Sequence, residues 1–271
     1  MSRDLIVIIG NLRGGFDAFR STMAACKGSG NNTLALVVPR EQYDTHPYWF
    51  RSGNYGIRNN NNDMLFNEPD DWDSAMDQYG TGWRKLSHLK SNWLGPCAGQ
   101  QGSAAILLWC RRRMGDYVQA IMNSGYDRMI VTRSDQLWAG YIPEDTGGGL
   151  TVPNGEWYGG ITDRLHIVSA TWVPEYIRAI RDIWDFPEHI MPLLARHADT
   201  INIEKALFHL LWRIPLYRIP YRTVCIKEPE DNNRWWSDCL PCDRLKKVVK
   251  YTSEYKLVCE NYGEDWQPIY E

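Results

Sequence analysis

The feature that most constrains the fold of this chain is a pair of apolar runs near its start, separated by a segment with helical periodicity. Residues 4–10 (DLIVIIG) and 34–39 (LALVVP) have the continuous apolar composition of strands that are buried on both faces. Residues 16–26 repeat apolar side chains at the spacing of one helical face. A strand, a helix and a strand in this order predict a βαβ unit, which is normally right-handed with parallel strands.

A third apolar run, residues 128–132 (RMIVT), ends abruptly in a segment that contains Arg133 and Asp135. A helix predicted over residues 103–123 and ended by Gly125 leads into it. Open α/β sheets bind ligands outside the carboxyl ends of their strands, so Asp135 is expected to face a cleft. An Asp beside an Arg suits a metal ion and a phosphorylated ligand. The alternative is an Asp that only caps a turn.

The rest of the chain continues the alternation of strand and helix signals. We expect short helices or a lid between Trp72 and Trp93, because a structureless loop over residues 43–102 would be unusual in a compact domain. The further predicted elements are a strand over 150–153, helices over 174–184 and 203–212, and an extended segment over 217–225. Together these elements predict an α/β fold with a mostly parallel central sheet flanked by helices, in a single domain over residues 1–271.

Composition limits the partners of the chain. Its formal net charge of -3 gives no general electrostatic reason to expect nucleic acid. No apolar stretch approaches the roughly 18 to 20 residues that span a bilayer, and the start lacks the layout of a signal peptide. The seven cysteines are an odd number, which favours reduced thiols. We therefore expect a soluble, cytoplasmic protein without an integral membrane segment; its oligomeric state stays open.

Aromatic side chains with a polar edge are unusually common, at 13 Trp and 15 Tyr against 6 Phe. Such side chains suit sugar rings and nucleobases, but they also suit packing at partly wet positions. The excess favours a carbohydrate or nucleotide ligand without deciding for one.

The turn after the first predicted strand is a candidate anion site. It contains Gly10, Asn11, Arg13 and Gly14 and leads directly into a helix. Backbone N–H groups at a helix start and an Arg side chain both favour phosphate. The turn matches neither a P-loop nor G-x-G-x-x-G. The alternative is a glycine-rich turn with a surface Arg.

Two further acidic residues are candidates for general acid–base chemistry. Gly159 and Gly160 precede Asp163 and Arg164, and two glycines permit close backbone approach to a ligand. Asp163 could accept hydrogen bonds from hydroxyls or act as a general base, or else form an Asp–Arg pair that fixes a turn. Glu204 begins an amphipathic segment, so it is either a second acid in the cleft or a first-turn carboxylate favoured by the helix dipole.

A structural zinc site is a minor alternative for the cysteines near the end of the chain. The thiolates would come from Cys225, Cys239, Cys242 and Cys259. Their outer spacings differ from the paired C-x-x-C arrangement of a zinc ribbon, so reduced cysteines remain the expectation. The histidines show no metal-binding motif, and we expect structural roles for His166, His197 and His209.

The order of these segments resembles small GT-A-like glycosyltransferases found in bacterial polysaccharide clusters and large DNA viruses. The resemblance covers roughly residues 4–212. The residues that carry it are Gly10 and Arg13; Tyr126, Asp127, Ile130, Arg133 and Asp135; Gly159, Gly160, Asp163 and Arg164; and Glu204. It implies a GT-A-like Rossmann-type domain, with a nucleotide-binding half over 1–140 and an acceptor-binding half and C-terminal tail over 141–271.

The resemblance also implies a nucleotide-sugar donor, a glycan or other hydroxyl acceptor, and usually Mn²⁺ or Mg²⁺ at an Asp-x-Asp motif. Asp135 matches the final Asp of that motif and would touch the metal or the donor diphosphate. Arg133 replaces the first Asp, so a metal-independent variant stays open. The implied donor side comprises Gly10, Asn11, Arg13, Gly14, Arg133 and Asp135. The implied catalytic acids are Asp163 and Glu204, and the implied acceptor side comprises Trp157, Tyr158, Gly160 and Arg164.

Two other classes of function compete with glycosyl transfer. A strand, a glycine-rich turn with an Arg, and a helix also suit the phosphates of a sulfonucleotide, as in a sulfotransferase. Such an enzyme would favour a Lys or Ser in the first turn, and neither occurs between Gly10 and Gly15. A Trp-rich protein that binds carbohydrate without catalysis is the third possibility.

Overall fold

The computed structural model describes residues 3–27, 32–55, 57–59, 64–122, 125–227 and 239–270. Its large sheet contains β1 (Asp4–Ile9), β2 (Thr33–Val37), β3 (Arg58–Asn59), β4 (Arg128–Thr132), β6 (Leu150–Asn154), β7 (Leu165–Ser169) and β8 (Leu216–Pro220). The strand order is β3-β2-β1-β4-β7-β6-β8. Six of these strands run in one direction, and β7 runs against them.

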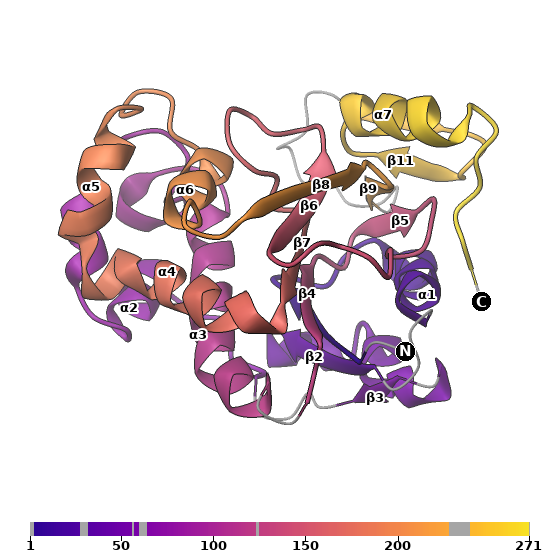
Figure 1. Ribbon diagram of the computed structural model, residues 1–271, viewed down its shortest axis with the longest axis horizontal. Helices are drawn as coiled ribbons and strands as arrows, with labels where there is room; N and C mark the ends of the chain where they lie inside the picture. The colour runs from indigo at the N-terminus through magenta and orange to yellow at the C-terminus, as the bar shows by residue number, and fades with distance from the viewer. Residues whose placement is uncertain are drawn as a thin grey trace.

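Helices cover both faces of this sheet (Figure 1). They are α1 (Gly15–Cys26), α2 (Trp72–Asp77), α3 (Ala104–Met122), α4 (Val173–Asp185), α5 (Pro187–Ala195) and α6 (Ile203–Leu210). Short 3-10 segments span Arg40–Tyr43, Pro47–Tyr55, Gly82–Leu86, Cys97–Gly99 and Ala170–Trp172. The mixed α/β architecture with a mostly parallel sheet agrees with the expectation from the sequence.

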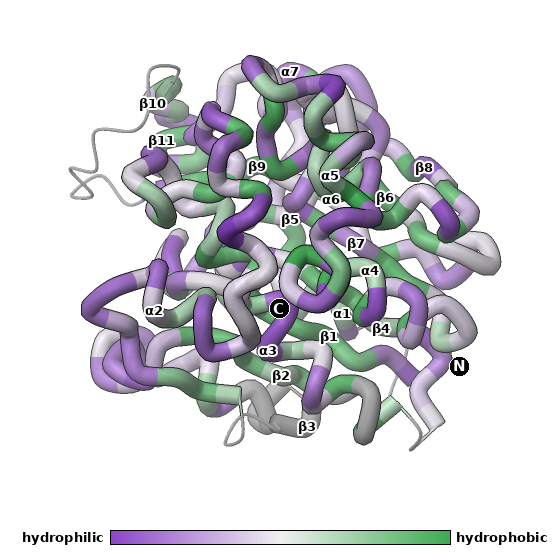
Figure 2. Tube along the Cα trace, turned by 90° about the vertical axis from the view of Figure 1, so that its left-hand side faces the viewer, coloured by the Kyte–Doolittle hydropathy of each residue, from purple (hydrophilic) through white to green (hydrophobic). Residues whose placement is uncertain are grey.

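The first strand divides its side chains between two apolar clusters. Leu5, Val7 and Ile9 pack in the cluster that includes α3, and Ile6 and Ile8 pack in the cluster that includes α1. Because successive side chains of a strand point to opposite faces, a strand covered on both faces has to be apolar throughout. Figure 2 shows the apolar segments gathered along the central strands, with polar segments around them.

Five fully buried tryptophans pack in these two apolar clusters. The fully buried ones are Trp49, Trp83, Trp93, Trp109 and Trp138. The indole N–H of Trp93 donates to the carbonyl of Leu89 at 2.9 Å, and that of Trp109 to the carbonyl of Ala75 at 2.9 Å. The aromatic excess therefore reflects core packing to a large extent.

A second, four-stranded sheet contains one strand that follows β4 and three strands from the part of the chain after β8, which we call the C-terminal segment. It contains β5 (Gln136–Trp138), β9 (Thr223–Lys227), β10 (Leu240–Cys242) and β11 (Lys247–Val249), in the order β10-β11-β9-β5. Helix α7 (Thr252–Tyr262) follows β11 and lies beside this sheet (Figure 1). The sequence predicted only an extended segment over residues 217–225 here, which the structure divides between β8 and β9, so β10, β11 and α7 are a correction.

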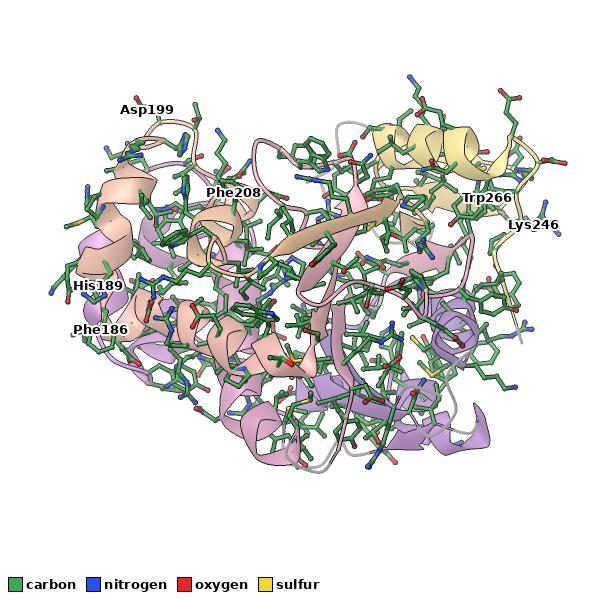
Figure 3. All side chains as sticks on the ribbon, in the orientation of Figure 1. Phe186, His189, Asp199, Phe208, Lys246 and Trp266 are labelled. Atoms are coloured by element: carbon green, nitrogen blue, oxygen red, sulfur yellow. The ribbon has the colours of Figure 1, made fainter. Side chains whose placement is uncertain are left out.

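The long axis of the molecule runs from the helical layer to this C-terminal sheet. Figure 3 places Phe186 and His189 at the outer corner of α4 and α5, and Trp266 and Lys246 beside the C-terminal segment at the opposite end. Within the described part of the chain, no helix is long and apolar enough to cross a bilayer.

Candidate active site

A pocket of about 610 Å³ opens where the carboxyl ends of β1 and β4 meet the beginning of β7. Its lining residues are Arg13, Asn92, Gly102, Ser103, Ala104, Ile106, Leu107, Arg133, Tyr158, Asp163, Arg164, Asn202, Ile203, Glu204, Lys250 and Tyr251. Figure 1 shows α6 on one side of the β4–β7 pair and the smaller sheet on the other. A separate cavity of about 720 Å³ lies among β10 and α7 and contains none of the residues predicted for the site.

Two hydrogen bonds join the turn after β1 to the loop after β4 at the edge of this pocket. The backbone N–H of Arg13 donates to Ser134 Oγ at 2.8 Å, and Ser134 Oγ donates to the Asn11 carbonyl at 3.1 Å. Gly14 has a φ of 76°, and a Cβ on it would lie 2.9 Å from the Cα of Asp135. Only glycine suits this close approach in a left-handed conformation, which brings Arg13 beside the residues after β4.

Asp135 lies behind the wall of the pocket rather than projecting into it. Its side chain is 2% exposed. Oδ1 accepts from Arg133 Nε at 3.0 Å, and Oδ2 accepts from Arg133 Nη2 at 2.8 Å and from Lys250 Nζ at 3.3 Å. Burial alone would raise the pKa of this carboxyl, but the charges of Arg133 and Lys250 outweigh it and hold the pKa well below its usual range.

This position corrects the expectation that Asp135 faces the cleft. The residues that face the cleft are its two cationic partners, Arg133 and Lys250, which both line the pocket. A bidentate Arg–carboxylate pair has a fixed geometry, so Asp135 sets the direction of the Arg133 guanidinium. Its observed contacts are with these two cations.

Asp163 and Arg164 reach the pocket because β7 is antiparallel to β4. Thr132, the last residue of β4, pairs with Leu165, the first of β7, so the residues before β7 lie at the carboxyl edge of β4. The Asp163 carboxylate accepts hydrogen bonds from Arg164 Nη1 and, at 3.5 Å, from Arg133 Nη1.

Burial opposes ionisation of Asp163, but the charges of Arg164 and Arg133 outweigh it and lower the pKa of Asp163 to about 2. A carboxylate with so low a pKa is a weak base near neutral pH, since general-base efficiency is greatest when the pKa lies near the working pH. Asp163 is therefore suited to orient the arginines around it.

Glu204 is the acid whose surroundings suit proton transfer. It lies in the first turn of α6, whose N-cap residue Asn202 accepts a hydrogen bond from the N–H of Lys205 at 2.9 Å. Burial and the neighbouring charge of Asp163, opposed by Arg164, raise the pKa of Glu204 to about 7. A carboxyl with a pKa near 7 in a pocket is typical of a general acid or base.

Gly160 lies against the start of this helix. A Cβ on Gly160 would lie 2.0 Å from the carbonyl oxygen of Glu204, and the N–H of Ile161 donates to that same carbonyl at 3.1 Å. The sequence predicted that the two glycines allow a ligand to approach. The structure shows that Gly160 instead allows the segment before β7 to approach the start of α6.

Lys250 and Tyr251 come from the C-terminal segment, and neither was predicted from the sequence. The N–H of Lys250 donates to the Cys225 carbonyl at 2.8 Å, which extends the pairing of β11 with β9 and fixes the backbone there. Lys250 Nζ lies 5.5 Å from the centre of the Tyr251 ring. Burial and the charge of Arg133, opposed by Asp135, lower the pKa of Lys250 to about 8.

Arg164 is held by the same segment. Its Nε donates to Glu254 Oε1 in α7 at 2.9 Å, and its guanidinium carbon lies 4.8 Å from the centre of the Tyr251 ring. Glu254 Oε2 accepts from the N–H of Cys225 at 2.9 Å. No local sequence signal marks Lys250 or Glu254, because contacts between distant segments bring Lys250 to the pocket and Glu254 to Arg164.

The N-terminal end of α3 forms the opposite wall, with Ser103, Ala104 and Leu107 among the lining residues. Helix α3 contains 19 residues, and the N-terminal end of a helix carries free N–H groups and a partial positive charge. Arg13 also lines the pocket, and its guanidinium makes no ion pair with another described residue. Both features favour an anionic ligand.

Of the two aromatic residues predicted for the acceptor side, only Tyr158 lines the pocket. Tyr158 lines it, is 45% exposed, and has a φ of 44°, an uncommon backbone conformation for a residue other than glycine. Trp157 is 39% exposed but does not line the pocket, and the guanidinium carbon of Arg218 lies 3.9 Å from its ring centre. The two aromatic side chains therefore do not form a single platform inside the pocket.

Six of the predicted site residues line the pocket, and six do not. Those that do are Arg13, Arg133, Tyr158, Asp163, Arg164 and Glu204. Those that lie behind or beside it are Gly10, Asn11, Gly14, Asp135, Trp157 and Gly160. Gly10 has a φ of 82° and donates from its N–H to the Val37 carbonyl at 3.1 Å, which is a structural role.

Potential metal ligands do not converge in the described ranges, where no three His, Cys, Asp or Glu side chains come together. The four cysteines considered for zinc are free and do not form such a group, so that alternative is not supported. His166 has a structural role: Nδ1 lies 2.8 Å from the Tyr176 hydroxyl and Nε2 lies 2.8 Å from the Thr162 carbonyl.

Comparison with known proteins gives little further information. No protein-family model matches the chain, and no curated protein matches it. Among solved structures, the chain is similar to the crystal structure of the glycosyltransferase GlyE in Streptococcus pneumoniae TIGR4, with a TM-score of 0.41 and 11% sequence identity. The match covers 81% of this chain and 46% of that chain, so this chain spans about half the length of GlyE. A likeness at this level carries no argument about activity.

Proposed function

We propose that this protein is a glycosyltransferase that moves a sugar from a nucleoside-diphosphate donor to a hydroxyl acceptor. The observation that carries the proposal is the pocket itself, where four cationic side chains surround two acidic ones at the carboxyl edge of an α/β sheet. The cations are Arg13, Arg133, Arg164 and Lys250, and the acids are Asp163 and Glu204. Ligands of open α/β sheets bind at this edge.

The cationic side of the pocket suits the leaving group. In glycosyl transfer the bond between the anomeric carbon and the diphosphate oxygen breaks, and the nucleoside diphosphate leaves with the electron pair. Arg13, Arg133 and Lys250, together with the N-terminal end of α3, would stabilise the negative charge that develops there. These groups are held in place before the ligand arrives, because Arg133 and Lys250 are already fixed by Asp135.

The acidic side suits the nucleophile. The acceptor hydroxyl oxygen forms the new bond to the anomeric carbon, and its proton has to leave. Glu204, with a pKa of about 7, would take that proton as general base. Asp163 would keep the pKa of Glu204 high and orient Arg133 and Arg164. Tyr158, exposed at the pocket, would contact the sugar ring or the acceptor.

A thermal-shift panel tests this function. We expect uridine or guanosine diphosphate, or one of their sugar derivatives, to stabilise the protein, because ligand at about 100 times its Kd adds about 2.7 kcal/mol to the free energy of unfolding. Arg13→Ala should reduce the shift, because Arg13 lines the pocket. Arg40→Ala is the matched control, since Arg40 is exposed and lies outside the pocket.

Other outcomes would contradict the proposal. Stabilisation by an adenosine bisphosphate but not by nucleoside diphosphates would indicate a sulfotransferase. Stabilisation by glycans alone would indicate a carbohydrate-binding protein. With the correct donor, we also expect slow release of nucleoside diphosphate in the absence of acceptor.

A further inference from the structure

The carboxylate expected to hold a divalent cation is already bound to two cationic side chains. Asp135 accepts two hydrogen bonds from Arg133, at 3.0 and 2.8 Å, and one from Lys250, at 3.3 Å. Both carboxylate oxygens are therefore engaged, and the side chain is 2% exposed. A divalent ion binds through oxygen atoms that it reaches directly, so the donor set at Asp135 does not fit a metal ion.

The two partners of Asp135 stand between it and the pocket. Arg133 and Lys250 both line the pocket, and Arg133 also lies 3.5 Å from the Asp163 carboxylate. Their side chains are 15% and 6% exposed, so few water molecules screen their charges. Arg133 and Lys250 therefore present two positive charges to the pocket, with Asp135 behind them and Asp163 beside Arg133.

The backbone fixes Lys250 in this position. Its N–H donates to the Cys225 carbonyl, and β11 pairs with β9, which pairs with β5 directly after Asp135. The carbonyl of Asp135 itself accepts from the N–H of Ile226 at 2.8 Å. Asp135 and Lys250 are thus held opposite each other by the smaller sheet, and neither has to move to meet the other.

We propose that Lys250 and Arg133 together take the place of the divalent cation, so that the protein binds the diphosphate of its donor without a metal ion. This inference rests on the function proposed above. Asp135 then acts as a positioning residue for both cations, and the C-terminal segment contributes a ligand-binding side chain. The chemical class of ligand is a nucleoside diphosphate, recognised through its phosphates.

Calorimetric titration of a nucleoside diphosphate into the full chain tests the inference, once in excess EDTA and once with Mn²⁺. We expect the wild-type Kd to agree within about twofold between the two conditions. Lys250→Met keeps much of the side-chain length without the charge and should weaken diphosphate binding in EDTA by about tenfold or more. Lys85→Met is the matched control, because Lys85 is exposed and lies outside the pocket, and it should leave the Kd unchanged.

A nucleoside monophosphate separates a binding role from a structural one. We expect Lys250→Met to weaken monophosphate binding less than diphosphate binding, whereas a general loss of structure would weaken both alike. Asp135→Asn should also weaken diphosphate binding in EDTA, because it removes the charge that holds Arg133 and Lys250 in place.

The outcomes separate this inference from the proposed function. Binding of nucleoside diphosphate by the wild type only with Mn²⁺ would overturn the inference and leave the function standing. Unchanged binding by Lys250→Met in EDTA would also overturn it. Absence of binding in both conditions, across a panel of nucleoside diphosphates, would overturn the proposed function itself. The wild-type comparison needs no variant, so it decides the matter even where Lys250→Met does not fold.

Discussion

At the scale of single residues, the two acids of the pocket differ in what their surroundings do to their charge. Asp163 lies against Arg164 and Arg133, which outweigh its burial and lower its pKa to about 2. Glu204 lies beside Asp163 instead, and its pKa is raised to about 7. Environments that push two carboxyl pKa values apart usually assign the two groups different roles. Here Glu204 is the candidate base and Asp163 orients the arginines.

The first prediction concerns the pH dependence of turnover. Because Glu204 has to be ionised to accept a proton, we expect the rate to rise with pH and to level off above about pH 7. Glu204→Gln should lower the rate by about 100-fold or more and remove this rise. The turnover of Asp163→Asn serves as the comparison, because Asp163 orients the arginines and is not the candidate base. A variant Glu204→Gln with wild-type turnover would remove Glu204 from the mechanism.

The second prediction concerns stability at the same residue. The folded state raises the pKa of Glu204 above its ordinary value of 4.5, so this group favours folding below pH 4.5 and that contribution is lost as pH rises through about 7. Glu204→Gln removes the buried charge. Its thermal midpoint should therefore exceed that of the wild type at pH 8 and differ less at pH 5, as measured by scanning calorimetry. Equal midpoints at pH 8 would contradict the raised pKa.

At the scale of structural elements, the close contact between the segment before β7 and α6 places Glu204 in the pocket. A Cβ on Gly160 would lie 2.0 Å from the Glu204 carbonyl, and backbone cannot yield as a flexible side chain does. We expect Gly160→Ala to lower the free energy of unfolding by about 1 to 3 kcal/mol and to reduce turnover, as measured by denaturant titration and rate.

Gly148→Ala is the matched control for this substitution, because a Cβ there meets nothing within 4 Å. It should leave both stability and turnover close to those of the wild type. If Gly160→Ala behaves in the same way as Gly148→Ala, then α6 does not depend on this contact.

A buried ion pair joins the first residues of β1 and β4, at the end of these strands opposite to the pocket. Arg128 donates to Asp4 at 2.9 and 2.6 Å, and their side chains are 7% and 3% exposed. Arg128→Met removes the two hydrogen bonds that Arg128 donates to the buried Asp4 carboxylate, and removing one member of a buried ion pair costs about 3 to 5 kcal/mol. Chemical denaturation should show this loss, while nucleoside diphosphate affinity of the folded variant stays unchanged. A loss below about 1 kcal/mol would contradict the role of the pair.

The elements that the sequence predicted are those with local signals. The strands β1, β2, β4 and β6 are apolar runs, and α1, α3, α4 and α6 repeat apolar side chains along one face, so neighbouring residues suffice to predict them. The elements β3, β5, β7, β10, β11, α5 and α7 were not predicted. Strands of three residues such as β11 (KVV) are stabilised by pairing with distant segments, which leaves no periodic pattern to read.

The candidate site divides in the same way. Arg133 was predicted because it follows an apolar strand, and Glu204 because it begins an amphipathic helix. Asp163 was predicted because it follows two glycines. The orientation of Asp135 was not predictable, because it depends on Lys250, which is 115 residues away in the sequence. The two residues come together only through the pairing of β5, β9 and β11, which no local sequence pattern predicts.

At the scale of the whole molecule, the C-terminal segment completes a pocket that the large sheet begins. The sheet supplies Arg13, Arg133 and Arg164 at its carboxyl edge, and the smaller sheet and α7 supply Lys250 and the partner of Arg164, Glu254. Donor binding should therefore stabilise the large sheet and the smaller sheet with α7 together. We infer that the diphosphate of a nucleotide donor binds between these two parts.

A crystal structure of the protein with a bound nucleoside diphosphate tests this claim most directly. We expect diphosphate oxygens within about 3.2 Å of nitrogen atoms of Arg133 and Lys250, with the N-terminal end of α3 directed at them. Nucleotide bound elsewhere on the protein, or a diphosphate that contacts neither Arg133 nor Lys250, would contradict it.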